Sequence, residues 1–200
     1  MTDTRAPRVL GIAGSPRRNG NSDRLLAACL DGAAGAGAEI TRLVVAEADI
    51  APCTGCNACS KDGRCNVEDG MQAVYPRLDA ADAIVVATPV FFATVPATLK
   101  SLYDRCQPYW ARRYVQHQPI ERRRPGGLLV VGGGGDPFGN SCAVTTTRSV
   151  FAVLGLDYLH ELAVRADLPT DVAGRPAELD SAATLGAALA IEAADRIAGL

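Results

Sequence analysis

The chain has 200 residues, 48% of them hydrophobic, and a formal net charge of −2. This length suits one well-buried core, so we expect a single domain at residues 8–200 behind a flexible arm at residues 1–7. The small charge argues against nucleic acid or an anionic membrane as the main partner, and no segment is apolar enough to span a bilayer. Seven cysteines and a start without a signal-peptide core predict a cytoplasmic protein rather than a secreted disulfide framework.

Short apolar runs alternate with helical patterns along the chain. We expect strands at Val9–Ala13, Ile40–Val45, Ala83–Thr88, Leu128–Val131 and Tyr158–Val164. Helices are expected at Ser22–Ala34, Met71–Leu78, Pro96–Trp110, Ala143–Leu154 and Ala177–Ala198. The alternation predicts an α/β doubly wound sheet of five parallel strands with helices on both faces. Ligands of such sheets bind beyond the carboxyl ends of the strands, so the loops after the first four strands are the candidate site.

The loop at residues 52–66 contains four cysteines with the spacing C-x2-C-x2-C-x5-C. They are Cys53, Cys56, Cys59 and Cys65. Soft thiolates select iron–sulfur clusters or zinc, and the close spacing of the first three favours a [4Fe–4S] cluster. Structural zinc, a redox dithiol and four unrelated thiols are the alternatives.

The other cysteines and the two histidines belong to no motif. Cys29, Cys106 and Cys142 lie in apolar or helical patterns and are expected to behave as small hydrophobic residues. His117 and His160 are expected to be surface or structural residues. The sequence therefore predicts no catalytic acid or base.

The loop after the first strand, Gly14–Ser22, reads G-S-P-R-R-N-G-N-S and opens a helix. Free backbone N–H groups at a helix start favour an anion, and the arginines add charge-assisted hydrogen bonds. The loop lacks the G-K-[ST] of a nucleoside triphosphatase and the pattern G-x-G-x-x-G. It predicts a site for a terminal monophosphate, with an ordinary polar loop as the alternative.

Two further loops offer surfaces for a flat ligand. Thr88–Ala97 carries the adjacent rings Phe91 and Phe92 between two prolines that stiffen it. One interpretation is that these rings contact a flat apolar ligand. The alternative is that they only cover the sheet. Gly132–Gly135 has almost no side chains, which permits close approach of a ring system or makes a flexible turn.

Three motifs together resemble the flavodoxin-like NAD(P)H-dependent FMN reductase family. They are G-S-P-R-R-N-G-N-S, P-C-T-G-C-N-A-C and T-P-V-F-F-A-T-V-P-A-T-L-K-S-L-Y-D-R, within about Val9–Tyr114. The cysteine spacing resembles the iron–sulfur flavoprotein branch in particular. Where many relatives have Tyr or Trp in the third loop this chain has phenylalanines, which keep stacking but lose a phenol hydrogen bond. Many relatives also hold only part of the cysteine set and carry no cluster.

The resemblance implies FMN as a cofactor, a [4Fe–4S] cluster on the four cysteines, and a set of flavin contacts. The implied phosphate contacts are Ser15, Arg17, Gly20, Asn21 and Ser22. The implied isoalloxazine contacts are Pro89, Val90, Phe91 and Phe92, with Gly132, Gly133 and Gly134 at the flavin edge. It also implies a homodimer or homotetramer.

FMN takes up a hydride and can release single electrons, whereas a cluster transfers one electron at a time. We therefore expect an oxidoreductase that moves electrons from NAD(P)H or a small electron carrier to a small-molecule acceptor. The alternatives are an FMN or quinone reductase without a cluster, a flavodoxin-type carrier, and a zinc-stabilised module without flavin. The basic segment Trp110–Arg124 is a solvated face or a docking site for a nicotinamide dinucleotide phosphate, an acidic carrier or a second subunit.

Overall fold

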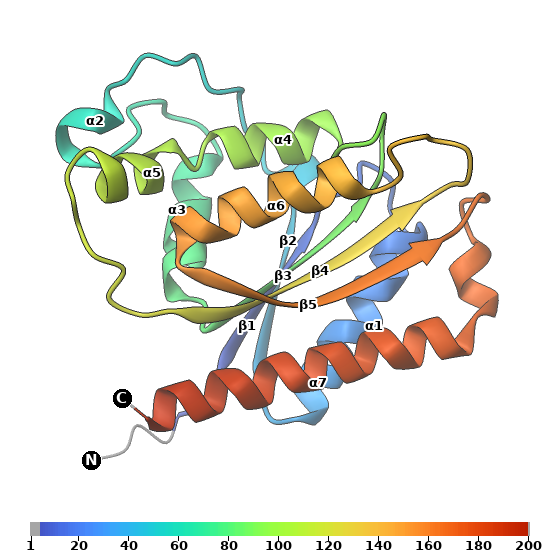
Figure 1. Ribbon diagram of the computed structural model, residues 1–200. Helices are drawn as coiled ribbons and strands as arrows, with labels where there is room; N and C mark the ends of the chain where they lie inside the picture. The colour runs from blue at the N-terminus through green and yellow to red at the C-terminus, as the bar shows by residue number, and fades with distance from the viewer. Residues whose placement is uncertain (1–4, 200) are drawn as a thin grey trace.

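The computed structural model describes residues 5–199 and has a five-stranded parallel sheet at its centre (Figure 1). The strands are β1 (Arg8–Ala13), β2 (Glu39–Val44), β3 (Ala83–Pro89), β4 (Arg124–Gly132) and β5 (Leu156–Arg165). The helices are α1 (Asn21–Gly35), α2 (Cys59–Asp62), α3 (Met71–Ala80), α4 (Ala97–Asp104), α5 (Gln107–Tyr114), α6 (Ser141–Leu154) and α7 (Pro176–Ala198). Two short 3-10 helices, η1 (Val45–Glu47) and η2 (Asp171–Gly174), complete the elements.

The strand order is β2-β1-β3-β4-β5, and every neighbouring pair is parallel. Helices α1 and α7 cover one face of the sheet and α3 to α6 cover the other (Figure 1). The predicted flavodoxin-like doubly wound fold is confirmed. The chain changes direction across the sheet between β1 and β3, and loops that diverge at such a point leave a crevice for a ligand.

The central strands are apolar throughout because both of their faces are covered. In β3, Ile84 and Val86 pack on the side of α3 to α6, while Val85 and Ala87 pack on the side of α1 and α7. The edge strand β2 is mostly exposed, so its sequence is more polar. This burial difference explains why continuous apolar runs mark the central strands in the sequence.

The predicted helix Pro96–Trp110 is wrong, because the chain breaks into α4 and α5 at Arg105 and Cys106. Pro108 lies in the first turn of α5, where its missing N–H leaves no hydrogen bond unmade. The fourth strand is also longer than predicted and begins at Arg124. Its first half contains proline and two glycines, which do not look like a buried strand.

Asp82 lies almost fully buried at the amino-terminal edge of the sheet and binds three arginines. It pairs with Arg5 and Arg122 at 2.5 Å each, and with Arg8 at 3.6 Å. Burial raises the pKa of Asp82, but the hydrogen bonds from Arg5, the Arg8 backbone and Arg122 outweigh it and lower the pKa. Of the arm expected at residues 1–7, residues 1–4 lie outside the described part, and Arg5 is tied to this carboxylate. Among the described residues, no helix has the length and apolar character needed to cross a membrane.

Helices α1 and α7 approach each other closely through two glycines. A methyl group on Gly186 would lie 1.8 Å from the Cys29 carbonyl oxygen, and one on Gly32 would lie 2.0 Å from the Ala183 carbonyl oxygen. Neither position can accept a side chain without moving a helix backbone. These glycines therefore set the distance between the two helices.

We predict that Gly186→Ala lowers the free energy of unfolding by roughly 3 kcal/mol, because the helices must separate to admit the methyl group. Urea denaturation of both proteins measures this difference. The matched control is Gly35→Ala, in the same helix pair, where nothing lies within 4 Å of the added atom. That substitution should leave stability unchanged or raise it slightly. Equal effects of the two substitutions would contradict the close contact.

Candidate flavin cavity and cysteine cavity

Two backbone hydrogen bonds fix the starts of the first and third loops to the neighbouring strands β3 and β4 at the carboxyl edge of the sheet. The Gly14 N–H donates to the Ala87 carbonyl at 2.8 Å, and the Val90 N–H donates to the Val131 carbonyl at 2.8 Å. Between the loops lies a cavity of about 310 Å³. It is lined by Ser15, Pro16, Arg17, Gly20, Asn21, Ser22, Pro89, Phe91 and Val131. Seven of the predicted flavin contacts thus line one cavity, and Pro16 and Val131 join them.

Helix α1 begins beside this cavity without a side-chain cap. Gly20 is the N-cap residue and offers no side chain to bind the free N–H groups of the first turn. The Arg17 guanidinium makes no hydrogen bond or ion pair within residues 5–199, whereas Arg18 is paired with Glu47. Free N–H groups and a free guanidinium at one helix start suit an anion.

Asn21 and Ser22 are both buried, but their side chains do different things. The Asn21 amide donates to the Leu168 carbonyl at 2.7 Å and accepts from the Val172 N–H at 3.0 Å. It therefore ties the loop after β5 to α1. The Ser22 hydroxyl makes no hydrogen bond to any described residue, so it is free to bind a ligand in the cavity.

The third loop is a tight turn that separates its two phenylalanines. Phe91 and Thr94 exchange backbone hydrogen bonds of 2.8 and 3.1 Å, and the two residues between them, Phe92 and Ala93, have φ angles of 50° and 64°. Phe91 lines the cavity, but Phe92 is 99% exposed at the tip of the turn. The structure thus brings only one of the two predicted stacking rings to the cavity wall.

The glycine loop after β4 lies beside the cavity without lining it. Gly132 lies next to the Val90 side chain, and the Gly134 N–H donates to the Asp167 carboxylate at 2.9 Å. Gly133 and Gly134 are exposed. Of the predicted flavin contacts, Val90, Phe92 and these three glycines therefore surround the site or point away from it.

The four cysteines line one separate cavity of about 370 Å³, together with the end of α4 and the start of α5. All four are free thiols of intermediate or full exposure. Burial raises the pKa of the Cys59 thiol, and the other three cysteines raise it further, so the four sulfurs interact. Within residues 5–199, however, no group of three or more His, Cys, Asp or Glu side chains is arranged to hold a metal ion.

The two cavities lie at opposite ends of α4. The loop of residues 52–66 leaves the carboxyl edge after β2 and passes back over the helices, so that α2 lies beside α5 (Figure 1). The cavity between the first and third loops includes Phe91, which precedes α4, whereas the cysteine cavity includes Asp104, the last residue of α4. The two cavities share no lining residue.

Arg105 and Asp69 close the base of the cysteine loop, and sequence reasoning did not identify them. The Asp69 carboxylate accepts from Arg105 at 2.5 and 3.0 Å and from the Ala51 N–H at 2.8 Å. These hydrogen bonds hold the pKa of Asp69 below its usual range. The available signal was a single arginine inside the apolar pattern L-Y-D-R-C.

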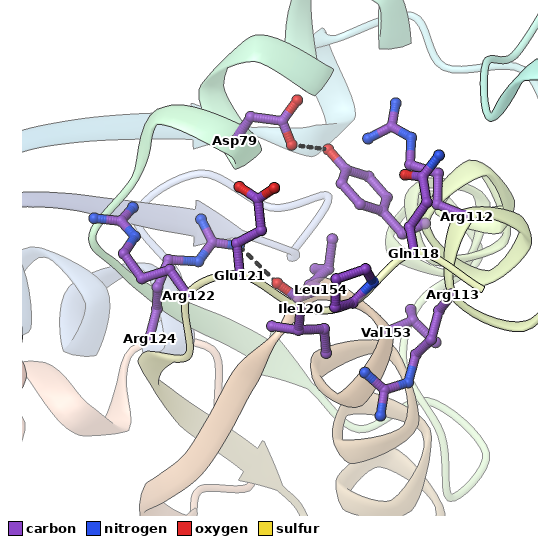
Figure 2. A pocket seen from close by; sticks show the side chains of 12 residues that line it. Asp79, Arg112, Arg113, Gln118, Ile120, Glu121, Arg122, Arg124, Val153 and Leu154 are labelled. Atoms are coloured by element: carbon purple, nitrogen blue, oxygen red, sulfur yellow. Dashed lines mark hydrogen bonds between the residues drawn. The ribbon is translucent and has the colours of Figure 1, made fainter. Parts of the chain in front are cut away.

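A third cavity, of about 500 Å³, lies at the amino-terminal edge of the sheet (Figure 2). Two of the arginines that line it, Arg122 and Arg124, bind backbone carbonyls of the protein. Arg124 donates to the Leu78 and Ala81 carbonyls and to the Leu154 carbonyl, so it joins the ends of α3 and α6. The Tyr109 hydroxyl donates to the Asp79 carboxylate at 2.7 Å, a hydrogen bond drawn as a dashed line to Asp79 in Figure 2. This part of the basic segment Trp110–Arg124 is therefore largely structural.

Neither histidine lines either candidate cavity. His160 lies on β5 and contacts the Glu192 carboxylate of α7 at 2.8 Å. His117 is an exposed loop residue with a φ angle of 55°. Neither lines a cavity that contains the phosphate loop or the cysteines.

The sheet topology defines a flavodoxin-like α/β protein, in which α1 begins after the first strand without a side-chain cap. A family model described as NADPH-dependent FMN reductase matches residues 7–167, and the chain belongs to this family.

Relatives extend this assignment to the iron–sulfur flavoprotein branch. An iron-sulfur flavoprotein of Methanocaldococcus jannaschii is 33% identical over 148 residues, which cover 73% of this chain and 71% of that protein. An iron-sulfur flavoprotein of Methanosarcina thermophila is 38% identical over 98 residues, 49% of this chain and 51% of that protein. This chain spans about half the length of that relative and of two others like it.

Solved structures agree with the fold. An NAD(P)H:quinone oxidoreductase from Methanothermobacter marburgensis superposes with a TM-score of 0.69 at 18% identity, covering 92% of this chain and 98% of the other. A flavone reductase gives a TM-score of 0.68 at 18% identity, covering 94% and 63%. At these identities the likeness is one of fold.

We predict that Asn21→Ala lowers the free energy of unfolding by roughly 1–3 kcal/mol, because the buried Val172 N–H and the Leu168 carbonyl lose their partner. Thermal or urea unfolding of the purified variant measures the loss. Ser22→Ala is the matched control at the next position, since it removes no hydrogen bond seen in the described chain. An unchanged stability of the Asn21 variant would show that the amide does not hold the loop after β5.

Proposed function

We propose that the protein is an FMN-dependent oxidoreductase that also carries an iron–sulfur cluster. The observation that supports this most directly is the cavity shared by the phosphate-type loop and the aromatic loop, in a chain of the FMN reductase family. The electrons would pass from NAD(P)H or a small electron carrier to a small-molecule acceptor. A homodimer or homotetramer remains our expectation for its assembly.

The first loop is proposed to bind the terminal phosphate of FMN. Arg17 would give a charge-assisted hydrogen bond, and the Ser22 hydroxyl and the backbone N–H groups of Gly20 to Ser22 would complete the cradle. Ser15 lies at the cavity wall, where its hydroxyl already accepts from the Arg17 N–H at 3.0 Å. One phosphate suits a loop of this size and charge, which favours FMN over a dinucleotide.

The ring system of the flavin is proposed to lie between the third loop and the end of β4. Pro89, Phe91 and Val131 supply apolar contact and exclude water from one side. Val90 and Gly132 to Gly134 would border the ring. FMN supplies both hydride and single-electron chemistry when bound, so the chain itself needs to bind and orient rather than act as a nucleophile. Neither histidine is positioned to transfer a proton there.

The donor set in the second cavity fits a [4Fe–4S] cluster. Cys53, Cys56, Cys59 and Cys65 are free thiols around one space, and soft thiolates are the ligands that such clusters use. The cluster would supply one-electron transfer, and the four cysteines would hold it.

The second candidate is an FMN or quinone reductase without a cluster. It is favoured by the same observation that no described group of side chains is arranged to hold a metal ion. Iron, acid-labile sulfide, zinc and flavin counted in anaerobically purified protein separate the two functions. About four irons and four sulfides per chain support the first, and their absence with full flavin supports the second.

We predict that Arg17→Ala combined with Ser22→Ala weakens FMN binding about 10-fold or more, because charge-assisted and hydroxyl hydrogen bonds to the phosphate are lost. Fluorescence titration of the apoprotein with FMN measures the affinity. Arg18→Ala removes an equal charge from the same loop but breaks only the pair with Glu47, so it should bind FMN normally. Full affinity in the double variant, or extraction of FAD, would refute this assignment of the loop.

We predict that Cys59→Ala removes most of the iron–sulfur absorbance and leaves FMN bound, because the two cavities share no residue. The measurements are iron, labile sulfide and flavin per chain. Cys142→Ala is the control, since that cysteine is exposed on α6, and the buried Cys29→Ala should likewise leave the cluster intact. A cluster that survives in the Cys59 variant would exclude this ligand set.

A further inference from the structure

The most unusual polar side chain in the fold is Arg105, which follows α4 and is only 1% exposed. Its two terminal nitrogens donate to the Ala51 carbonyl at 2.9 Å, the Val67 carbonyl at 3.3 Å, and both oxygens of Asp69. Ala51 precedes the cysteine loop, and Val67 and Asp69 follow it. One guanidinium therefore holds the two stems of that loop together.

These contacts use all four hydrogens on the terminal nitrogens and leave Nε–H alone. Arg105 Nε is the one buried side-chain nitrogen in residues 5–199 that has no hydrogen-bond partner. An unsatisfied buried donor costs about 1–3 kcal/mol, and more in a charged group. The unpaired Nε–H of Arg105 is therefore a candidate donor to a group bound next to it.

Arg105 lines the cysteine cavity together with Cys53, Cys56, Cys59 and Cys65. The Asp69 carboxylate supplies the counter-charge for the buried guanidinium. The Tyr75 hydroxyl donates to the Arg105 carbonyl at 2.8 Å and so fixes the backbone at this residue.

We propose that Arg105 is a positioning residue of the cluster site: its terminal nitrogens close the cysteine loop, and its Nε–H donates to a sulfur of the bound cluster. The inference rests on the proposed cluster function. Thiolate-ligated clusters are anionic, so a buried cation that donates to a sulfur stabilises the reduced state and raises the reduction potential. Contacts outside the ligand set also slow loss of the metal centre.

The first test compares four anaerobically purified holoproteins: the wild type, Arg105→Lys, Arg105→Gln and Arg112→Gln. Arg112 is the matched control because its Nε donates to the Gly63 carbonyl of the same loop at 2.9 Å without lining the cavity. Potentiometric titration gives the cluster potential, and iron release to a chelator gives its lability. Flavin content reports folding in each variant.

We expect Arg112→Gln to match the wild type in potential and flavin content. Arg105→Lys keeps the charge but loses the Nε–H, so its potential should fall modestly and its iron should leave roughly 10-fold faster. Arg105→Gln also loses the charge and should show the larger fall. Wild-type potentials in both Arg105 variants would overturn the proposal.

A second measurement uses the intact protein and does not depend on how the variants fold. Pulsed electron paramagnetic resonance of the reduced cluster, in protein containing ¹⁵N-labelled arginine, detects a nitrogen hydrogen-bonded to a cluster sulfur. The coupling should be present in the wild type and Arg112→Gln and absent in Arg105→Lys. A full cluster without this coupling overturns the role of Arg105 alone, whereas wild-type protein without labile sulfide overturns the cluster and this role together.

Discussion

The parallel register of the central strands is the constraint on which the cavity between the first and third loops depends. Thr88 pairs with Val130 and Pro89 with Val131, so β3 and β4 end at the same level. The hydrogen bonds of Gly14 and Val90 continue the pairing just beyond the strand ends. Because three loops start from one level edge, the polar first loop and the apolar residues Pro89, Phe91 and Val131 can line one cavity without long connecting segments.

Two buried arginines join segments of the chain that lie outside the sheet. Arg124 binds carbonyl groups at the ends of α3 and α6, where the helix dipoles are negative. Arg105 binds the two stems of the cysteine loop in a similar way. A planar guanidinium with several fixed donors can join separate carbonyls that no strand or helix brings together. The same feature makes these two positions poor choices for substitution by lysine.

Much of the fold follows from the sequence, because buried parallel strands are continuous apolar runs and α1 opens after a loop rich in Gly, Ser and Asn. The break between α4 and α5 could have been anticipated from Pro108, since proline has no N–H to donate to the carbonyl four residues back and is tolerated only in the first turn of a helix. The start of β4 could not, because Pro125 and two glycines are atypical of a buried strand. This first part of β4 keeps its strand geometry because β3 and β5 pair with it on both sides.

The candidate site residues also fall into those that the sequence predicts and those that it does not. The phosphate loop is local in sequence, so its residues could be named in advance, and seven of the predicted contacts line one cavity. Phe92 could not be placed, because its left-handed backbone is rare for a residue other than glycine, asparagine or aspartate. Asp69 and Arg105 are 36 positions apart, and only the folded chain brings them together.

The way Arg105 binds both stems also bears on how such a chain can change over evolutionary time. One guanidinium reaches carbonyls on either side of residues 52–66, so the two ends of that loop lie within a few residues' reach of each other. The four cysteines therefore lie in an excursion between two stems that one guanidinium joins, so the sheet does not fix the length of chain between those stems.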